Sequence, residues 1–366
     1  MELSLNRKSF IDSLSCCCVV CGRSKTLPIL DNVLFECRNG VLVLRSSDGD
    51  VFIERIIDSV FPPMDFCYCV NGRDLLKLLK SFSDEEFVLS FRDNGLCIIG
   101  YVGGEFELPY IDGSDFPYAL RDMGNEHSVS LSSSVLLGML SSARPFVSTD
   151  SLRPVLCGIY FYVLGNEFGV CSTDGRGLYH SYLSQGAFDF DLSCIISSSS
   201  LDAFLSLLSA TDSSCRVVLS ERTLTIFLDS YGSVSARLVD GRYPNFRSVI
   251  PSSSPIKCSV NRKSLLGAIS RASLCASAVS SCIVLDITNA SMTVSSTDLD
   301  FRRKSTQNLE CCANAPIRLG VSANVLKSCL EAHSTDTVDL CLIAPDRAIK
   351  IESDGLTTLA MPLKID

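Results

Sequence analysis

One phrase of polar residues occurs three times in the chain and has the composition of a reactive site. It reads Ser-Ser-Asp-Gly at 46–49, Ser-Thr-Asp-Gly at 172–175 and Ser-Thr-Asp-Leu at 296–299. Each copy follows a short apolar run that predicts a strand, so each places hydroxyl and carboxylate groups at a strand end. Such a group could bind a metal ion or a phosphate in an enzyme.

Three observations argue against catalysis by these phrases. Their aspartates lie 126 and 124 residues apart, as turn residues of a repeated unit would. Asp-Gly after a strand is a common turn signal. The three histidines, His127, His180 and His333, have no spacing typical of a triad or a metal site. We therefore expect turns, no metal, no cofactor and no enzyme, with a catalytic site as the alternative hypothesis.

The chain has nineteen cysteines, which raises the question of disulfides or zinc. Cys18 and Cys21 form a CxxC, but no second CxxC or histidine pair completes a zinc site. We expect reduced thiols acting as small apolar residues. The N-terminus lacks the apolar stretch of a signal peptide, and no apolar run approaches the roughly 20 residues of a membrane span. The prediction is a cytoplasmic protein.

Helix-like segments recur in the same order in each third of the chain. The first of each third covers about 6–20, 131–140 and 261–269, and the second covers 71–80, 200–208 and 322–330. Asn6 and Asn261 each precede Arg-Lys-Ser and suit helix N-caps. The spacing of 255 residues between these two starts supports a repeated unit.

Strand-like runs surround these helices. After the first helix come runs at 29–36 and 41–45, at 156–163 and 168–172, and at 283–287 and 292–295, followed by a further strand such as 51–57 or 301–307. Asn39-Gly40 predicts a hairpin between the first two. Three-strand meanders close the units at 87–109, 216–239 and 338–363. The predicted order is β-α-β-β-β-α-β-β-β, an α+β fold, with domains at 1–122, 128–250 and 256–366 and polar linkers between them.

Four motifs carry a resemblance to a known family. They are Leu-Pro-Ile-Leu-Asp-Asn-Val-Leu at 27–34, Ser-Thr-Asp-Gly-Arg at 172–176, Gly-Arg-Tyr-Pro-Asn-Phe-Arg at 241–247 and Met-Pro-Leu-Lys-Ile at 361–365. In order and spacing the chain resembles the bacterial replicative sliding clamp, the beta subunit of DNA polymerase III. The resemblance implies three similar domains, each with two helices packed on antiparallel sheets, and a head-to-tail homodimer that forms a six-domain ring around duplex DNA.

The resemblance also implies a function without catalysis. The ring tethers the replicative polymerase to DNA and so confers processivity. Partners would be double-stranded DNA of any sequence, a second copy, and the polymerase alpha subunit, clamp loader and repair factors through short clamp-binding peptides. A membrane is not expected as a partner. An adaptor ring that does not bind DNA is the remaining alternative.

The distribution of charge agrees with a DNA-encircling ring. The chain has a net charge of −9, yet the six helix candidates, counted over 6–20, 71–82, 131–146, 198–210, 261–275 and 322–333, together carry +6, which leaves −15 elsewhere. A basic lining attracts phosphates without reading bases. The central third departs from this pattern, because its helices carry almost no basic residues. Solvated helix faces are the alternative explanation of the charges, and the threefold repeat favours the basic lining over it. The predicted DNA contacts are Arg7, Arg23, Lys25, Arg73, Lys77, Lys80, Arg153, Arg262 and Lys263.

The family binds partner peptides in an apolar pocket between its second and third domains. By motif, the pocket residues here are Leu156, Thr173, Gly175, Arg176, Gly177, Leu178, Pro244, Val249, Leu359, Ala360, Met361, Pro362 and Leu363. Ordinary core or strand-end positions are the alternative for most of them. Met361-Pro362 is the more telling pair, because proline cannot donate to a sheet ladder. Ser248 and Asp366 depart from the family pattern and make the pocket rim less basic.

The family's ring closes by edge-strand pairing between the first domain of one copy and the third domain of the other. Candidate interface residues are Lys77, Phe106, Leu108, Leu274, Asp298, Asp300 and Arg303. Residues 103–108 alternate apolar and polar side chains as an edge strand would, and an exposed edge invites pairing. A strand simply covered by solvent is the alternative.

Overall fold

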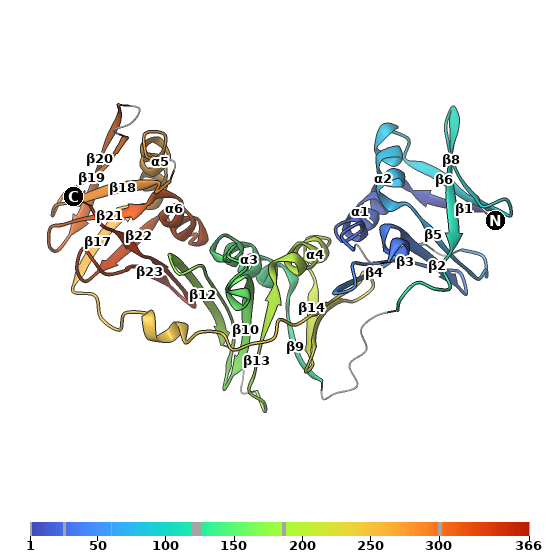
Figure 1. The fold of residues 1–366 in the computed structure, drawn as a ribbon, viewed down its shortest axis with the longest axis horizontal. Coiled ribbons are helices and arrows are strands. Elements are labelled where there is room, and N and C mark those ends of the chain that lie inside the picture. The colour runs from blue at the N-terminus through green and yellow to red at the C-terminus, as the bar shows by residue number, and fades with distance from the viewer. Residues whose placement is uncertain are drawn as a thin grey trace. The chain divides into compact units, whose positions relative to one another are not determined.

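The computed structural model describes residues 2–24, 27–59, 61–118, 126–184, 188–277, 279–298 and 302–365. It is an α+β structure in which the same series of elements occurs three times (Figure 1). The helices are α1 Arg7–Cys18 and α2 Gly72–Ser81 in the first repeat, α3 Ser133–Ala143 and α4 Ser198–Leu208 in the second, and α5 Arg262–Ser273 and α6 Ala323–Ala332 in the third.

Eight strands accompany the two helices of each repeat. The first repeat has β1 Glu2–Asn6, β2 Val33–Arg38, β3 Val41–Ser47, β4 Val51–Ile56, β5 Phe66–Val70, β6 Glu86–Arg92, β7 Leu96–Tyr101 and β8 Gly104–Asp112. The second has β9 His127–Ser132, β10 Gly158–Leu164, β11 Glu167–Thr173, β12 Gly177–Ser184, β13 Leu192–Ser197, β14 Ser214–Leu219, β15 Thr223–Leu228 and β16 Gly232–Arg237. The third has β17 Ile256–Asn261, β18 Cys282–Ile287, β19 Ser291–Asp298, β20 Arg303–Ala313, β21 Ile317–Ser322, β22 Thr337–Leu342, β23 Ile349–Ser353 and β24 Leu356–Ala360, with the short β25 Pro362–Leu363 after it.

The helix caps and the hairpin turn that the sequence predicts are present in the structure. Asn6 and Asn261 cap α1 and α5, each accepting a hydrogen bond from the backbone N–H three residues on. Asn39 and Gly40 both have positive φ angles, of 52° and 80°, which is the backbone of a type I′ hairpin turn between β2 and β3.

Two details of the predicted order are wrong. Each repeat has four strands between its helices, not three, because β5, β13 and β21 precede the second helix. The predicted strands at 29–36 and 156–163 begin later than expected, since Pro28–Asp31 and Pro154–Leu156 form 3₁₀ turns. Proline fixes φ near the helical value and removes a donor, which favours a turn over a sheet ladder at these positions.

Packing divides the chain into two compact units. Unit 1 consists of Met1–Gly138 with Ser199–Leu238, and unit 2 of Met139–Ser198 with Val239–Asp366. Each contains one antiparallel sheet that crosses a repeat boundary: β4 pairs with β16 in unit 1, and β12 pairs with β24 in unit 2. The division into three domains therefore stays a prediction from the sequence.

Unit 1 is built on a sheet with the strand order β1-β6-β7-β8-β5-β2-β3-β4-β16-β15-β14-β9. Helices α1 and α2 pack against each other beside this sheet (Figure 1). Phe10 of α1 is buried against Phe35 and Phe87 of the sheet, with ring centroids 6.1 and 5.3 Å away. Burying aromatic rings of this size supplies much of the apolar stabilisation of a core.

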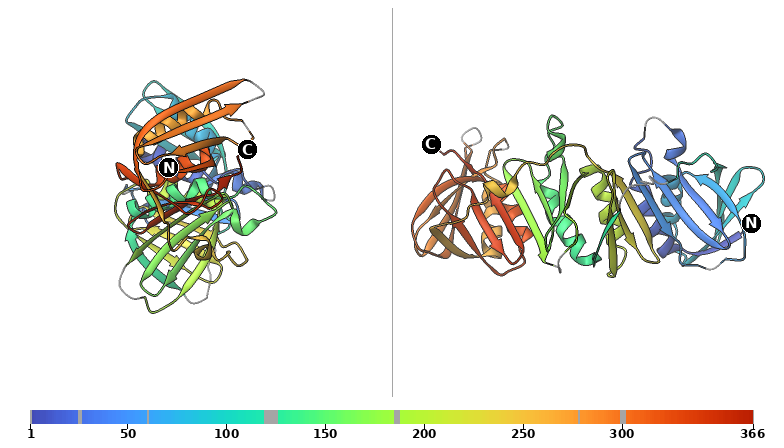
Figure 2. Two further views of the ribbon diagram at one scale, coloured as in Figure 1. Left: turned by 90° about the vertical axis from the view of Figure 1, so that its left-hand side faces the viewer. Right: turned by 90° about the horizontal axis from the view of Figure 1, so that it is seen from below.

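Unit 2 is built on a sheet with the strand order β13-β10-β11-β12-β24-β23-β22-β17-β20-β19-β18-β21-β25. The long β19–β20 hairpin, orange in Figure 2, runs along one side of this unit. A buried cluster includes Leu156, Leu178, Tyr243, Phe246 and Leu359. Segments that are far apart in the sequence meet in this cluster, and they form the walls of the site described next.

Candidate functional site

Unit 2 contains a cavity of about 710 Å³ whose walls are mainly apolar. Its floor comes from strands β12 and β24, where Leu178 lies opposite Leu359 and both side chains are buried. Its rim is more open, since Val249 is 55% and Met361 44% exposed. A preformed apolar cavity with few polar groups is the usual form of a site for apolar anchors.

The repeated phrase Ser-Thr-Asp-Gly forms the turn at one end of this cavity. The Asp174 carboxylate accepts hydrogen bonds from the backbone N–H groups of Arg176 and Gly177, both at 2.8 Å. Thr173 accepts from the Gly175 N–H at 3.1 Å, and Gly175 has a φ of 86°. A side chain with a Cβ would be strained at that φ angle. The carboxylate is thus occupied in shaping the turn.

The first copy of the phrase makes the same turn. Asp48 accepts from the backbone N–H groups of Asp50 and Val51 at 3.1 and 2.8 Å, and Ser47 accepts from the Gly49 N–H. The predicted turn-making role is confirmed for Asp48 and Asp174. Asp298 ends β19 and is buried, while the residues that follow it, 299–301, lie outside the described residues.

The C-terminal segment is held against this turn by a main-chain hydrogen bond. The Met361 N–H donates to the Arg176 carbonyl at 2.8 Å, directly after the paired strands β12 and β24. Met361 therefore lies at the rim with its thioether side chain partly exposed. Methionine is flexible and polarisable, which suits a wall that adapts to different apolar partners.

A cluster of rings supports the cavity on the side of the 3₁₀ turn Phe246–Val249. Phe246 packs 4.8 Å from the His180 ring, and the Tyr162 hydroxyl lies 2.8 Å from His180 Nε2. Burial, together with the nearby Arg247 guanidinium, lowers the pKa of His180 to about 4. Arg247 in turn donates to Glu167 at 2.8 Å. His180 is therefore a neutral core residue at ordinary pH.

The structure brings nine of the thirteen predicted pocket residues to this cavity. They are Leu156, Thr173, Gly175, Gly177, Leu178, Pro244, Val249, Leu359 and Met361. The other four lie elsewhere: Arg176 lines a neighbouring cavity of about 270 Å³, Ala360 is buried in the sheet, and Pro362 and Leu363 pair with β21. Of the two residues that depart from the family pattern, Ser248 lines the cavity, and Asp366 lies outside the described residues.

Sequence reasoning missed several residues of the wall. They are Asn245, Phe246, Ile250, Pro251, Ile343, Asp346, Arg347 and Ala348. Asn245 and Phe246 lie within the motif at 241–247 and Ile250 and Pro251 soon follow it, so extending the pocket along that motif would have found them. Those at 343–348 precede β23, and only the pairing of β23 with β24 brings them to the site. No local signal marks them.

Most predicted basic residues are engaged by the fold. Arg7 of α1 donates to the carbonyls of Asp84 and Leu79, and Arg262 of α5 donates in the same way to Thr335 and Leu330. These guanidinium groups therefore brace the end of the second helix in the first and third repeats.

Three further arginines also have partners. Arg23 pairs with Asp202 at 3.5 Å, Arg73 donates to the Cys21 carbonyl, and Arg153 pairs with Asp150 at 2.9 Å. The side chains of Lys77 and Lys263 are about three-quarters exposed and make only weak pairs, of 3.3 and 3.6 Å, with neighbouring aspartates. Lys80 is exposed as well, and Lys25 lies outside the described residues.

Two strands carry most of the predicted interface residues. Phe106 and Leu108 are half-buried in β8, and Arg303 begins β20. Leu274 follows α5 and is 73% exposed, whereas Asp300 lies outside the described residues. Within the described ranges, residues 104–109 of β8 pair only with β7, and residues 303–310 of β20 pair only with β19. Residues 104–109 of β8 and 303–310 of β20 thus each have one edge without a partner strand among the described residues.

The structure gives the cysteines no catalytic arrangement. All nineteen are free thiols, and burial raises the pKa of Cys69, Cys97 and Cys194 to about 12. In the part of the chain that the structure describes, no three His, Cys, Asp or Glu side chains gather as metal ligands. No described helix has the length and apolar character needed to cross a membrane.

Comparison with known families gives matches at both ends of the chain. Residues 1–120 match the family model for the N-terminal domain of the DNA polymerase III beta subunit, and residues 247–364 match the one for its C-terminal domain. The chain is 23% identical over 376 residues to the beta sliding clamp of Staphylococcus epidermidis, covering 100% of this chain and 99% of the relative. The Staphylococcus aureus beta sliding clamp is also 23% identical, over 379 residues.

Solved structures share the fold. The DNA polymerase III beta subunit of Thermotoga maritima aligns with a TM-score of 0.90 at 18% identity, and each chain is covered completely. A sliding clamp of Pseudomonas aeruginosa bound to griselimycin aligns with a TM-score of 0.92 at 19% identity, again over 100% of both chains. The fold is therefore retained although four-fifths of the aligned residues differ.

Proposed function

Because this chain belongs to the family of DNA polymerase III beta subunits, the beta sliding clamps, we propose that two copies close head to tail around duplex DNA and tether a polymerase there. As a member of the family the chain is a non-catalytic clamp subunit that serves processivity in DNA replication. How the ring closes and where its partners bind are the parts that we propose from this chain's own residues.

The observation that carries the proposal is a repeated strand pairing. Strand β4 of the first repeat pairs with β16 of the second, and β12 of the second repeat pairs with β24 of the third. Strands β4, β12 and β20 occupy the same place in the three repeats, and so do β8, β16 and β24. By the same rule, β20 of the third repeat should pair with β8 of the first repeat of another copy. Since residues 104–109 of β8 and 303–310 of β20 each have an unpartnered edge among the described residues, the missing pair forms between two copies.

The two existing pairs set the register of the proposed one. Val51 lies opposite Ala236, and Gly177 lies opposite Ala360. The equivalent alignment places Arg303 of one copy opposite Leu108 of the other, and Phe106, two residues earlier in β8, opposite Ser305. Two identical contacts of this kind close a ring by symmetry. Leu274 follows α5, which packs on β20, and so extends the apolar part of this contact.

The exposed lysines support contact with DNA. Lys77, Lys80 and Lys263 lie on helices α2 and α5, and their ammonium groups are free enough to approach phosphates. Such contacts supply affinity without reading sequence, which allows sliding. The arginines that brace helix ends contribute less, because their donors already bind carbonyl oxygens.

The apolar cavity of unit 2 is the proposed site for partner peptides. Leu156, Leu178, Leu359 and Met361 offer apolar contact, and the backbone turn at Thr173–Gly175 offers polar groups that fix orientation. We expect short peptides of the polymerase alpha subunit, the clamp loader and repair factors to insert apolar side chains here. This assignment implies that the protein works in the cytoplasm, where the chromosome is replicated.

Retention on DNA tests the proposal. Labelled protein is loaded on nicked circular DNA by a bacterial clamp loader and ATP, and the complex is separated by gel filtration. We expect retention on the circle and loss after the circle is cut, because a topological link ends at a free DNA end. An adaptor ring that does not bind DNA would give no retention on either substrate.

A matched pair of variants tests ring closure. Leu108→Arg places a guanidinium opposite Arg303 and should give a monomer in sedimentation at micromolar concentration and no retention on circles. Adding Arg303→Glu converts the repulsion to attraction and should restore the dimer. A Leu108→Arg protein that stays dimeric would show that the β8–β20 pairing is wrong.

A further inference from the structure

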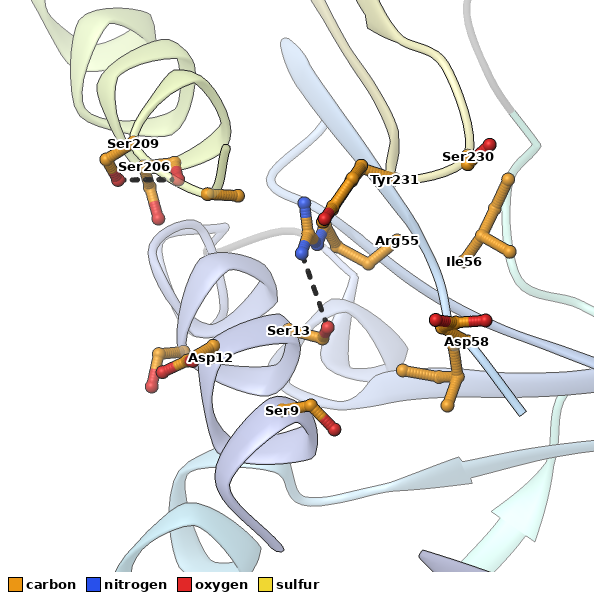
Figure 3. Close-up of a pocket in the computed structure, with 13 residues that line it drawn as sticks. Ser9, Asp12, Ser13, Arg55, Ile56, Asp58, Ser206, Ser209, Ser230 and Tyr231 are labelled. Carbon is orange, nitrogen blue, oxygen red and sulfur yellow. Dashed lines mark hydrogen bonds between the residues drawn. The ribbon is translucent and has the colours of Figure 1, made fainter. Parts of the chain in front are cut away.

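Helix α1 of unit 1 has two different surroundings. One side of it lines a second cavity, of about 860 Å³, whose walls carry six serines and the buried Arg55 of β4 (Figure 3). Its C-terminal end packs on helix α2 instead. The sequence Cys18-Val-Val-Cys21 lies at this end, where α1 ends at Cys18 and the chain turns. The proposed clamp function leaves this pair of cysteines without a role.

The Cys18 sulfur lies against the first residue of α2, which is Gly72. A Cβ added to Gly72 would collide with Val33 and would lie 3.1 Å from Cys18 Sγ. Glycine therefore allows the end of α1 to approach the start of α2 closely. The start of a helix is electropositive and stabilises a nearby negative charge, including that of a thiolate. The position of Cys18 thus favours its ionised form.

Two cations of α2 add to this electropositive environment. The Arg73 guanidinium lies against the turn after α1 and donates to the Cys21 carbonyl. A hydrogen bond from Cys21, together with the charges of Arg73 and Lys80, lowers the pKa of the Cys18 thiol, although partial burial opposes this shift. Burial raises the pKa of the neighbouring Cys17 thiol. Adjacent cysteines of α1 are therefore expected to differ in reactivity.

Cys21 is placed to react with an oxidised Cys18. The chain keeps a helical turn here, since the Arg23 N–H donates to the Val20 carbonyl at 3.3 Å. Residues three apart in such a turn present their side chains on the same side. Cys21 is fully buried, whereas Cys18 is half-buried. A partly exposed, acidic thiol beside a second thiol is the usual arrangement at sites of reversible cysteine oxidation.

We propose that Cys18 and Cys21 form a site of reversible oxidation by hydrogen peroxide. The Cys18 thiolate attacks one oxygen of the peroxide, the O–O bond breaks and hydroxide leaves, so Cys18 becomes a sulfenic acid. The Cys21 sulfur then attacks the Cys18 sulfur and the S–O bond breaks. The oxygen leaves as water with the proton of the Cys21 thiol, and a disulfide remains. A dithiol such as dithiothreitol returns both residues to thiols by exchange and is itself oxidised.

Peptide mapping of the full-length protein is the direct test. Reduced protein is exposed to increasing hydrogen peroxide, unfolded, labelled with N-ethylmaleimide and digested with trypsin. The tryptic peptide 9–23 contains Cys18 and Cys21 together with two further cysteines. We expect this peptide to lose two labels at low peroxide, because two thiols have become a disulfide, and to regain both after dithiothreitol.

Variants identify the reacting pair. Cys21→Ala removes the second thiol, so oxidation should stop at a Cys18 sulfenic acid that dimedone traps. Cys18→Ser should leave the other thiols of peptide 9–23 fully labelled. Cys17→Ala is the matched control, since Cys17 is adjacent and buried, and it should oxidise as the unaltered protein does. Arg73→Gln keeps both thiols and should slow the loss of labels severalfold, because a cation beside Cys18 is gone.

Exposure alone makes the opposite prediction and supplies an internal reference. Cys312 is exposed, so a reaction governed by access would oxidise it before the half-buried Cys18. Peroxide is therefore raised until Cys312 is oxidised. A peptide 9–23 that is still fully labelled at that point would overturn the proposal, and so would a loss of labels in Cys18→Ser equal to that in the unaltered protein. The test needs neither DNA nor a partner, so its failure would leave the clamp function untouched.

Discussion

The two cavities of this protein are similar in size and opposite in chemistry. The unit 2 cavity, of about 710 Å³, has mainly leucine, valine and methionine walls, and the Asp174 carboxylate of the adjoining turn is bound by backbone N–H groups. The unit 1 cavity, of about 860 Å³, has serine walls and a buried guanidinium with unspent donors. Volume does not distinguish them. The chemistry of the walls does, because the leucine and methionine side chains of the unit 2 cavity suit an apolar peptide and the serines of the unit 1 cavity do not.

The largest effect is expected from removing the rim of the apolar cavity. Deleting residues 361–366 takes away Met361 and should weaken a polymerase-derived peptide by about 2–4 kcal/mol, the range of a central apolar anchor. Fluorescence anisotropy with a labelled peptide measures the loss.

A milder variant controls for the loss of β25 in that deletion. Val249→Asp changes a side chain that is 55% exposed, so the fold should persist while a charge enters the apolar rim. Peptide affinity should again fall at least tenfold. If both variants bind peptide as tightly as the unaltered protein, the unit 2 cavity is not the peptide site and the comparison between the cavities fails.

The next largest effect is a loss of stability at acid pH, and it should arise in unit 2, because the two histidines with strongly lowered pKa values both lie there. Burial lowers the pKa of His180 and of His333 from the usual 6.5 to about 4. The unfolded chain therefore binds protons between pH 6.5 and 4 that the folded state does not. Stability is full above pH 6.5 and falls as the pH drops, by about 1.4 kcal/mol per histidine per pH unit.

Urea unfolding at pH 7 and pH 5 measures this dependence. At pH 5 each histidine should remove about 2 kcal/mol of the stability present at pH 7. His180→Gln should lessen the loss by its own share, because glutamine keeps a polar partner for Tyr162 and takes up no proton. His127→Gln, outside unit 2, serves as the control. An unchanged slope in His180→Gln would mean that His180 titrates normally in the folded protein.

The parts of the fold that the sequence predicted depend on short-range signals. Asn6 and Asn261 cap helices and Asn39-Gly40 makes a hairpin because each acts on atoms within four residues. Strand β5 was missed because Phe66–Val70, with its two cysteines, shows no clean alternation of buried and exposed positions. The three-fold period was visible because each repeat keeps the same order of such signals.

The candidate sites were predictable only where a motif carries them. The turn at 172–176 and the end at 361–363 stand out as motifs, whereas Ile343 and Ala348 reach the apolar cavity through the register of β23 on β24. Arg55 gave no signal at all. It shares a face of β4 with the buried Val51 and Ile53, but an arginine at the end of a short strand does not by itself indicate burial. The position of Ile343 and Ala348 and the burial of Arg55 both depend on contacts between segments far apart in the chain, which sequence spacing does not encode.

The smallest expected effect comes from two equivalent turns, one in each unit. Asp48 and Asp174 accept two backbone N–H groups each at closely similar distances, and both side chains are half-buried. Replacing either by alanine should cost about 1 kcal/mol of stability, since the freed N–H groups are partly accessible to water. Urea unfolding should therefore rank Asp48→Ala and Asp174→Ala as equals.

Peptide binding should separate these two variants where stability does not. Asp174→Ala loosens the turn that presents Thr173 and Gly175 to the apolar cavity, so peptide affinity should fall severalfold, whereas Asp48→Ala should leave it unchanged. Equal stability with unequal affinity would mean that one turn serves the fold in both units and was put to a second use only beside the apolar wall. Equal affinity would place the turn outside the peptide site and reduce that site to its leucine and methionine side chains.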